Sequence, residues 1–193
     1  MPGMRINLPR LRERLAASKT SSAGTAVARR AAVLVPLQLV EQQWHLLFIR
    51  RAEVAGDVHS GQVAFPGGHL EAGESTQQAA LREAEEEIAL QAADVESIGA
   101  LPDFVSITDV CVTPQLALLP WPYPFRLQTQ EVSRVFTVPL AWLADPSHFY
   151  TRIRVVNDCP RQVIYYQPYQ GETLWGLTAA ITHSLLVVLN ELD

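Results

Sequence analysis

The stretch that decides the fold runs from Gly68 to Leu90 and reads GHLEAGESTQQAALREAEEEIAL. It begins as a glycine-containing loop. Ser75 is then followed three residues later by Gln78, which is the spacing of a capping box at the start of a helix. The pattern predicts a helix over Thr76–Ala89 whose small apolar residues pack closely against a sheet.

Three carboxylates in the second half of this helix fall on one side of it. Each helical residue advances by about 100°, so Glu83 and Glu87 are about 40° apart and Glu86 lies about 60° to the other side of Glu83. Like charges on neighbouring turns repel, and a hard cation such as Mg²⁺, which prefers carboxylate oxygens, would remove the conflict. Glu85 points elsewhere and is expected to face solvent. The alternative interpretation of the run is a solvated acidic face without a ligand.

The spacing of the charged residues resembles the signature of the Nudix hydrolases, G-x5-E-x7-R-E-U-x-E-E-x-G-U, in which U is a bulky aliphatic residue. The matching positions are Gly68, Glu74, Arg82, Glu83, Glu86, Glu87 and Leu90. The chain departs from the signature at Ala84, where U stands, and at Ala89, where glycine is usual. Neither departure removes a charged group.

This resemblance implies an α+β fold, an α/β/α sandwich around a mixed sheet, and hydrolysis of a pyrophosphate with Mg²⁺ or Mn²⁺. It implies a catalytic set made of Glu83, Glu86, Glu87, Arg82 and Glu74. The three helix glutamates and the main-chain oxygen of Gly67 would be metal ligands, and Arg82 with Glu74 would hold the loop on the helix. Glu83 would also orient or deprotonate the attacking water. Glu131 is the candidate base outside the signature, or else a surface residue.

The residues before the signature resemble the coenzyme A pyrophosphatase subfamily, whose pattern is roughly LLT-x-R-S-x3-R-x3-G-x-V-x-FPGG. The matching positions are Leu46, Leu47, Arg50, Gly61, Val63, Phe65, Pro66, Gly67 and Gly68. The second arginine of the pattern falls on Asp57, and an acid there would repel the 3′-phosphate of coenzyme A. We expect Arg50 or Arg51 to substitute, and Gly68 to contact the substrate. His59 is either a phosphate or water contact or an ordinary loop residue.

The leading hypothesis from these resemblances is hydrolysis of coenzyme A or its thioesters to 3′,5′-ADP and 4′-phosphopantetheine or its acyl form. A first alternative is a pyrophosphatase for ADP-ribose, NADH or another nucleoside diphosphate derivative, which the loss of the second arginine motivates. A second is a non-catalytic module that binds a nucleotide. All three take a small molecule as partner, and the family's common habit suggests a homodimer.

Composition bounds these hypotheses. The chain has 193 residues, 48% of them hydrophobic and 18% charged, which suits one well-buried domain and excludes extensive disorder. A formal net charge of −5 disfavours a general nucleic-acid-binding protein. Cys111 and Cys159 form neither a disulfide framework nor paired zinc ligands, and no secretory signal is evident, so we expect a cytoplasmic protein.

Residues 1–26 are expected to form a basic helix, Leu8–Ala17, and a linker, ahead of a hydrolase domain over 27–193. Strands are expected at Ala31–Val40, Trp44–Arg50, Gln62–Phe65, Ser97–Leu101, Cys111–Leu118, Glu131–Pro139, Arg152–Val156 and Gln162–Tyr166. Pro36 suggests an edge or a bulge in the first of them. Leu174–Leu192 is expected to be a closing helix rather than a membrane span.

Overall fold

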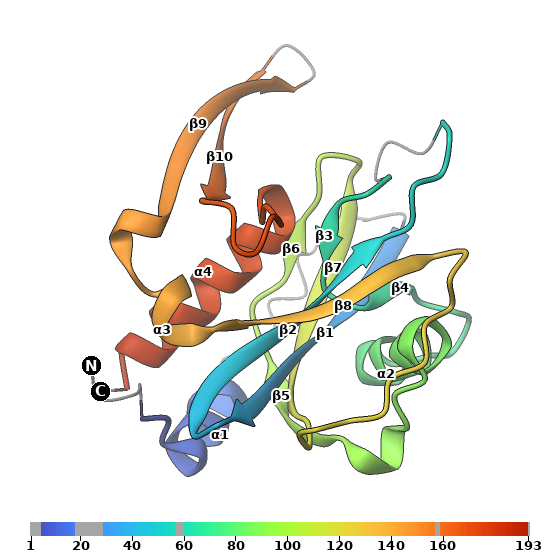
Figure 1. The fold of residues 1–193 in the computed structure, drawn as a ribbon, viewed down its shortest axis with the longest axis vertical. Coiled ribbons are helices and arrows are strands. Elements are labelled where there is room, and N and C mark those ends of the chain that lie inside the picture. Colours follow the sequence, from blue (N-terminus) through green and yellow to red (C-terminus); the bar gives the residue numbers. More distant parts are fainter. Residues whose placement is uncertain (1–4, 18–28, 57–59, 157–158, 193) are drawn as a thin grey trace.

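The computed structural model describes residues 5–17, 29–56, 60–156 and 159–192. In these ranges four α-helices flank a mixed sheet as an α/β/α sandwich, which confirms the predicted fold class (Figure 1). The helices are α1 (Leu8–Ala17), α2 (Thr76–Ile88), α3 (Leu140–Leu143) and α4 (Gly176–Asn190). Helix α2 covers one face of the sheet, and the other three helices cover the opposite face.

The main sheet has eight strands, and its central path runs β3-β2-β1-β7-β5. Its strands are β1 (Arg29–Val40), β2 (Gln43–Arg51), β3 (Val63–Ala64), β4 (Gly67–His69), β5 (Glu96–Ala100), β6 (Phe104–Val105), β7 (Val110–Leu118) and β8 (Val132–Pro139). Off the path, β4 pairs with β1, β6 with β7 and β8 with β2. Strands β1 and β7 are parallel and the other pairs are antiparallel, so the sheet is mixed.

Side chains alternate in direction along the central strands, so the strands contribute to two hydrophobic cores, one on each face of the sheet. In β2, Leu46 and Phe48 face the core beneath α1, α3 and α4, whereas Leu47 and Ile49 face the core beneath α2. The α2 side is lined by alanines, and Ala84 is completely buried there. A small side chain therefore stands where the signature has a bulky aliphatic one, and it lets α2 approach the sheet closely.

Strand β1 is interior, and its pairing with β7 runs through Pro36 without a register shift, so the expectation of an edge or a bulge at Pro36 is wrong. The proline instead lies where β1 changes partner on one side, from β4 at Ala31–Val33 to β2 at Leu37–Val40. The N–H of Leu34, two residues earlier on the same side, donates to the carbonyl of Pro66. A residue without an N–H is tolerated at Pro36 because no ladder bond is needed at this change of partner.

The N-terminal helix belongs to the same packed body as the sheet. Leu11 and Leu15 of α1 are buried in the core beneath α4, and Arg12 forms an ion pair with Glu96 of β5. The linker expected between this helix and residue 27 lies outside the described residues. Among the residues described, no helix is long and apolar enough to cross a membrane.

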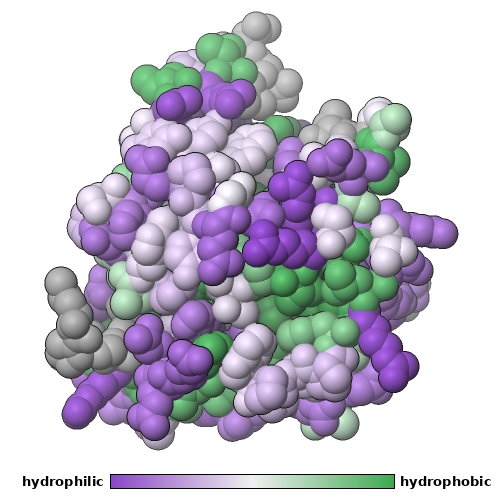
Figure 2. Space-filling view, in the orientation of Figure 1, coloured by the Kyte–Doolittle hydropathy of each residue, from purple (hydrophilic) through white to green (hydrophobic). Residues whose placement is uncertain are grey.

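Two strands form a separate antiparallel hairpin, which we call the arm: β9 (Phe149–Val156) and β10 (Cys159–Tyr166). The arm projects past the main sheet, with its base beside α4 (Figure 1). Ile153 and Val155 on β9 are 76% and 72% exposed, and apolar side chains gather near the end of the arm in Figure 2. The sequence pattern predicted both strands but gave them shorter bounds, and it missed β4, β6 and α3.

Candidate active site

The helix that carries the carboxylates begins as its sequence predicts. Ser75 Oγ accepts a hydrogen bond from the Gln78 N–H at 3.2 Å, and Gln78 Oε1 accepts one from the Ser75 N–H at 2.9 Å, so the capping box is formed. The helix ends at Ile88, one residue earlier than predicted, because Ala89 takes the left-handed conformation with φ 56° and ψ 33°. The signature has glycine at the position of Ala89 because glycine adopts the left-handed conformation without steric cost.

Two glycines place strand β4 directly against β1 and α2. A Cβ on Gly67, whose φ is +155°, would overlap the carbonyl oxygen of Ala32, and a Cβ on Gly68 would overlap the carboxylate of Glu83. The N–H of Gly67 also donates to Glu87 Oε2 at 3.0 Å. The backbone at Gly67–Gly68 therefore lies on the carboxylate face of α2. A Cβ at Gly67 would meet fixed backbone, whereas a Cβ at Gly68 would displace the end of the Glu83 side chain.

Arg82 joins the loop to the helix. Its Nε and Nη2 donate to the two oxygens of Glu74 at 2.9 and 3.2 Å, and Nη2 also donates to the carbonyl of His69 at 3.0 Å. Its Nη1 donates to Glu83 Oε1 at 3.0 Å and to Glu86 Oε2 at 3.3 Å. Bidentate arginine–carboxylate pairs fix geometry as well as charge. The bonds from Arg82 to Glu74 and to the His69 carbonyl therefore fix the position of the glycine loop relative to α2.

The three helix glutamates differ in environment. Glu87 is 2% exposed, and burial raises its pKa to about 8, with a further increase from the charges of Glu83 and Glu131 and a decrease from the Gly67 N–H. Burial also raises the pKa of Glu83, against the lowering effect of Arg82. The side chain of Glu86 is 59% exposed. The site therefore holds a costly buried carboxylate beside two more accessible ones.

The donors of this site suit a hard divalent cation. Carboxylate oxygens are the ligands that Mg²⁺ and Mn²⁺ prefer, and a cation would relieve the cost of ionising Glu87 in a buried position. Within the described ranges, no three His, Cys, Asp or Glu side chains are already grouped to hold a metal. Glu83 and Glu86 bond to Arg82 and Glu87 to Gly67 instead, so binding would exchange some of these partners.

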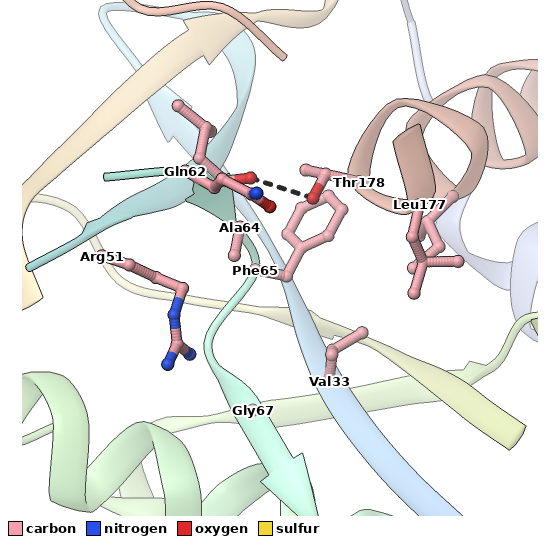
Figure 3. Close-up of a pocket in the computed structure, with 10 residues that line it drawn as sticks. Val33, Arg51, Gln62, Ala64, Phe65, Gly67, Leu177 and Thr178 are labelled. Carbon is pink, nitrogen blue, oxygen red and sulfur yellow. Dashed lines mark hydrogen bonds between the residues drawn. The ribbon is translucent and has the colours of Figure 1, made fainter. Parts of the chain in front are cut away.

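The consecutive arginines Arg50 and Arg51 face opposite sides of the sheet. Arg51 shares the α2 side and lines a cavity of about 180 Å³ together with Gly67 (Figure 3). In Figure 3 its guanidinium is directed away from Gln62, towards the side of Gly67. Burial dominates the pKa of Glu87, but the charge of Arg51 lowers it, which places this arginine close to the carboxylates.

Arg50 is held on the other side by carboxylates. Its Nη1 donates to Glu172 Oε2 at 3.1 Å and its Nη2 to Glu53 Oε1 at 3.0 Å. Glu172 is 5% exposed and also accepts a bond from Arg134 Nη1 at 3.0 Å. Glu172 was not predicted as a site residue, because a single glutamate in a loop belongs to no motif or helical or strand period.

Glu131, the candidate base outside the signature, acts on the helix glutamates through its charge. Glu131 lies in the exposed turn before β8, close enough to Glu83 and Glu87 for its charge to raise their pKa values, after the larger effect of burial. His59 and Asp57 lie outside the described residues. Gly68 lies on the carboxylate of Glu83, as described above.

A family model and related sequences both identify the same protein family. A model of the NUDIX domain matches residues 28–156. The chain is 37% identical over 158 residues to a protein of Escherichia coli (strain SMS-3-5 / SECEC) named "Uncharacterized Nudix hydrolase NudL", and the match covers 81% of both chains. A protein of the same name from Shigella boydii serotype 4 (strain Sb227) has the same identity and coverage.

Solved structures agree at the level of the fold. An Ap4A hydrolase of C. elegans in a binary complex matches with a TM-score of 0.51 and 22% identity, over 57% of this chain and 80% of that one. RenU, a Nudix hydrolase of M. smegmatis, matches with a TM-score of 0.51 and 22% identity, over 60% of this chain and 73% of that one. At this identity the likeness shows the fold alone.

Proposed function

The chain belongs to the Nudix hydrolase family, and from this premise we propose that it hydrolyses the pyrophosphate bond of coenzyme A or its thioesters with Mg²⁺ or Mn²⁺. In this reaction the oxygen of water forms a bond to one phosphorus and the bridging P–O bond breaks. One proton of the water is lost to a base, and the leaving phosphate oxygen takes up the electron pair. The products are 3′,5′-ADP and 4′-phosphopantetheine or its acyl form.

The proposed roles follow from the positions of the side chains. Glu83, Glu86, Glu87 and the carbonyl of Gly67 would hold the metal, which supplies charge neutralisation and an activated water when bound. Glu83 orients or deprotonates that water, with Glu131 as the alternative base. Arg82 and Glu74 hold the loop. Arg51 faces the same space and is suited to bind a phosphate oxygen. Arg50, which bonds to Glu172 and Glu53, positions the loop after β10 instead.

One observation carries the proposal of catalysis. The carboxylate of Glu87 is buried and bonded to the N–H of Gly67 at 3.0 Å, with Glu83 beside it and Arg51 close by. A solvated acidic helix face would have no reason to bury a carboxylate at this cost. The arrangement supports a charge-binding site rather than a surface of the helix.

Product analysis tests the proposal. The purified protein is incubated with coenzyme A and Mg²⁺ or Mn²⁺, or with EDTA, and the products are separated by chromatography. We expect 3′,5′-ADP and 4′-phosphopantetheine only with metal. Glu83→Gln should lower kcat by roughly 10²–10⁴-fold, as loss of a catalytic acid–base group does.

The matched control is Glu85→Gln, on the same helix but with an exposed side chain bonded to Gln91. It should leave kcat within about twofold, since surface changes are usually small. Metal-independent turnover, or equal loss in both variants, would contradict the proposed site. No turnover by the unaltered protein, together with nucleotide binding that Glu83→Gln leaves unchanged, would favour a nucleotide-binding module without catalysis.

The replacement of the second pattern arginine by Asp57 favours one alternative substrate class. ADP-ribose and NADH lack the 3′-phosphate that this arginine would be suited to bind. Equal kcat/KM for coenzyme A and ADP-ribose would replace the proposed substrate by this wider class. A homodimer stays a prediction, which sedimentation velocity checks.

A further inference from the structure

A second cavity, of about 370 Å³, lies between the arm and the start of α4. Its lining is mainly apolar and includes Ile107, Val163 and Trp175, and Arg154 of β9 brings a positive charge to it. A volume of this size is in the range of small-molecule sites. The cavity can therefore hold a group of a substrate rather than only water.

This arm cavity adjoins the smaller cavity beside the glycine loop. Gln62, Leu177 and Thr178 line both of them, and the smaller one also contains Gly67 and Arg51. A substrate whose diphosphate lies at Gly67 could therefore extend past Gln62 and Thr178 and reach the arm. The arm cavity is placed to receive what the diphosphate is attached to.

Three arginines share one face of the arm. Arg152 and Arg154 are alternate residues of β9, and Arg161 of β10 lies directly opposite Arg154. Like charges directly opposite one another destabilise a sheet. Throughout the described part of the chain, no carboxylate pairs with any of the three, although the formal net charge of the protein is −5. Among the residues that the structure describes, this face is therefore cationic and has no ion-pair partner.

Aromatic rings hold two of these arginines in place. The rings of Tyr150 and Tyr165 stack at 5.6 Å, and those of Tyr165 and Trp175 stack at 5.7 Å. The guanidinium of Arg152 lies 5.0 Å from the ring of Tyr150, and that of Arg154 lies 5.7 Å from the rings of Tyr165 and Trp175. Stacking uses the guanidinium face and leaves N–H groups on its edge for a planar anion such as phosphate.

The hydrogen bonds of Arg154 are consistent with a role in binding an anion. Its Nε donates to the Tyr165 hydroxyl at 2.7 Å, which fixes the side chain. No acceptor for its two terminal nitrogens lies among the residues described. The NUDIX domain match ends at residue 156, so β10 and Trp175 lie outside the part of the chain that the family model matches. The arm is thus suited to determine which substrate this chain prefers.

We infer that the arm binds a phosphate monoester carried by the nucleoside half of the substrate, with Arg154 and Arg161 as its ligands. This inference rests on the hydrolysis proposed above and assigns the further phosphate on the ribose of that substrate to the arm. It also supplies a cation in place of the arginine that the upstream sequence lacks. Arg152 adds to the local positive potential.

Binding of product-like nucleotides tests the inference without turnover. The full chain in EDTA is titrated by calorimetry with adenosine 3′,5′-bisphosphate and with 5′-AMP, which differ only in the 3′-phosphate. We expect the bisphosphate to bind about tenfold more tightly or better, as hydrogen bonds to a charged group allow. Arg154→Gln and Arg161→Gln should each reduce that preference about tenfold while leaving the affinity for 5′-AMP within about twofold.

Arg14→Gln is the matched control, because it removes one positive charge from α1, at the opposite end of the molecule from the arm (Figure 1). It should keep the full preference. Equal affinity of the two nucleotides for the unaltered protein overturns the inference, and so does a preference that both arm variants retain. Arg161 has no bonded partner among the described residues, so its variant still tests the inference if Arg154→Gln fails to fold. The titration is done without metal, so it measures nucleotide binding alone. If the proposed hydrolysis is wrong, the failure shows in the product assay and leaves the titration unaffected.

Discussion

The backbone N–H of Gly67 and the carboxylate of Glu87 are joined by a hydrogen bond of 3.0 Å. The bond links strand β4 to helix α2 and gives a buried carboxylate a donor. It compensates only part of the cost of burial, because the pKa of Glu87 is still raised to about 8. The metal-free site is therefore less stable with Glu87 ionised than with Glu87 neutral.

Glu87→Gln should stabilise the metal-free protein in a pH-dependent way. The folded pKa, about 8, lies above the ordinary value of 4.5, so ionisation of Glu87 weakens folding as the pH rises from about 4.5 to 8. Glutamine can still accept the bond from Gly67 but carries no charge. We expect the variant and the unaltered protein to melt together near pH 4.5, and the variant to melt higher at pH 8, in EDTA. Glu86→Gln, at a 59% exposed side chain, is the control and should show little change; a gap that closes with rising pH would contradict the prediction.

Alanine at the two neighbouring glycines should have different effects. At Gly68 the new Cβ meets the movable end of Glu83, so the fold should survive and activity should fall by about 10–100-fold, as when a metal ligand loses its orientation. At Gly67 the Cβ meets the backbone of Ala32, and φ is +155°, so the loss should be in folding stability. Parallel measurement of kcat/KM and Tm checks this contrast. Equal loss of Tm in both variants would count against it.

Ala89→Gly should stabilise the protein by about 1 kcal/mol, because a left-handed residue with a Cβ costs roughly that much. The φ of Ala89 is 56°, at the end of α2. Ala144 also ends a helix but has φ −78°, so Ala144→Gly should destabilise the protein. Urea unfolding of both variants gives the comparison. Stabilisation by both substitutions, or by neither, would show that the left-handed conformation is not the cause.

Glu172→Gln should destabilise the protein by about 1–3 kcal/mol. The buried carboxylate accepts bonds from Arg50 and Arg134, and the substitution removes the negative charge that both arginines share. Arg50 keeps its bond to Glu53 and Arg134 its bond to Gln170, and the partial exposure of the arginines also reduces the cost. Glu191→Gln breaks the exposed pair with Arg14 and should change the free energy of unfolding by less than about 0.5 kcal/mol. Urea denaturation measures both. Similar effects would mean that Glu172 is as solvated as a surface residue.

Local signals in the sequence were sufficient for the elements whose causes are local. The capping box at Ser75, the helix period of α2 and the alternation of β2 concern residues within a few positions of one another. The bounds of α1 were predicted to the residue, and those of β1, β2 and α4 to within a few residues. Strands β4 and β6 were missed because two or three residues show no period, and they exist only through pairing with β1 and β7.

The sequence by itself determined which charged residues stand at fixed steps on α2, because helix geometry turns spacing into direction. Only the tertiary structure decided which of them are buried: Glu87 lies under the Gly67 backbone, whereas Glu86 remains exposed. It also decided that Arg51 faces the carboxylates and Arg50 the buried Glu172, since the two sides of a strand meet different layers. The cationic face of the arm was likewise invisible in the sequence, because Arg154 and Arg161 become neighbours only when β9 and β10 pair.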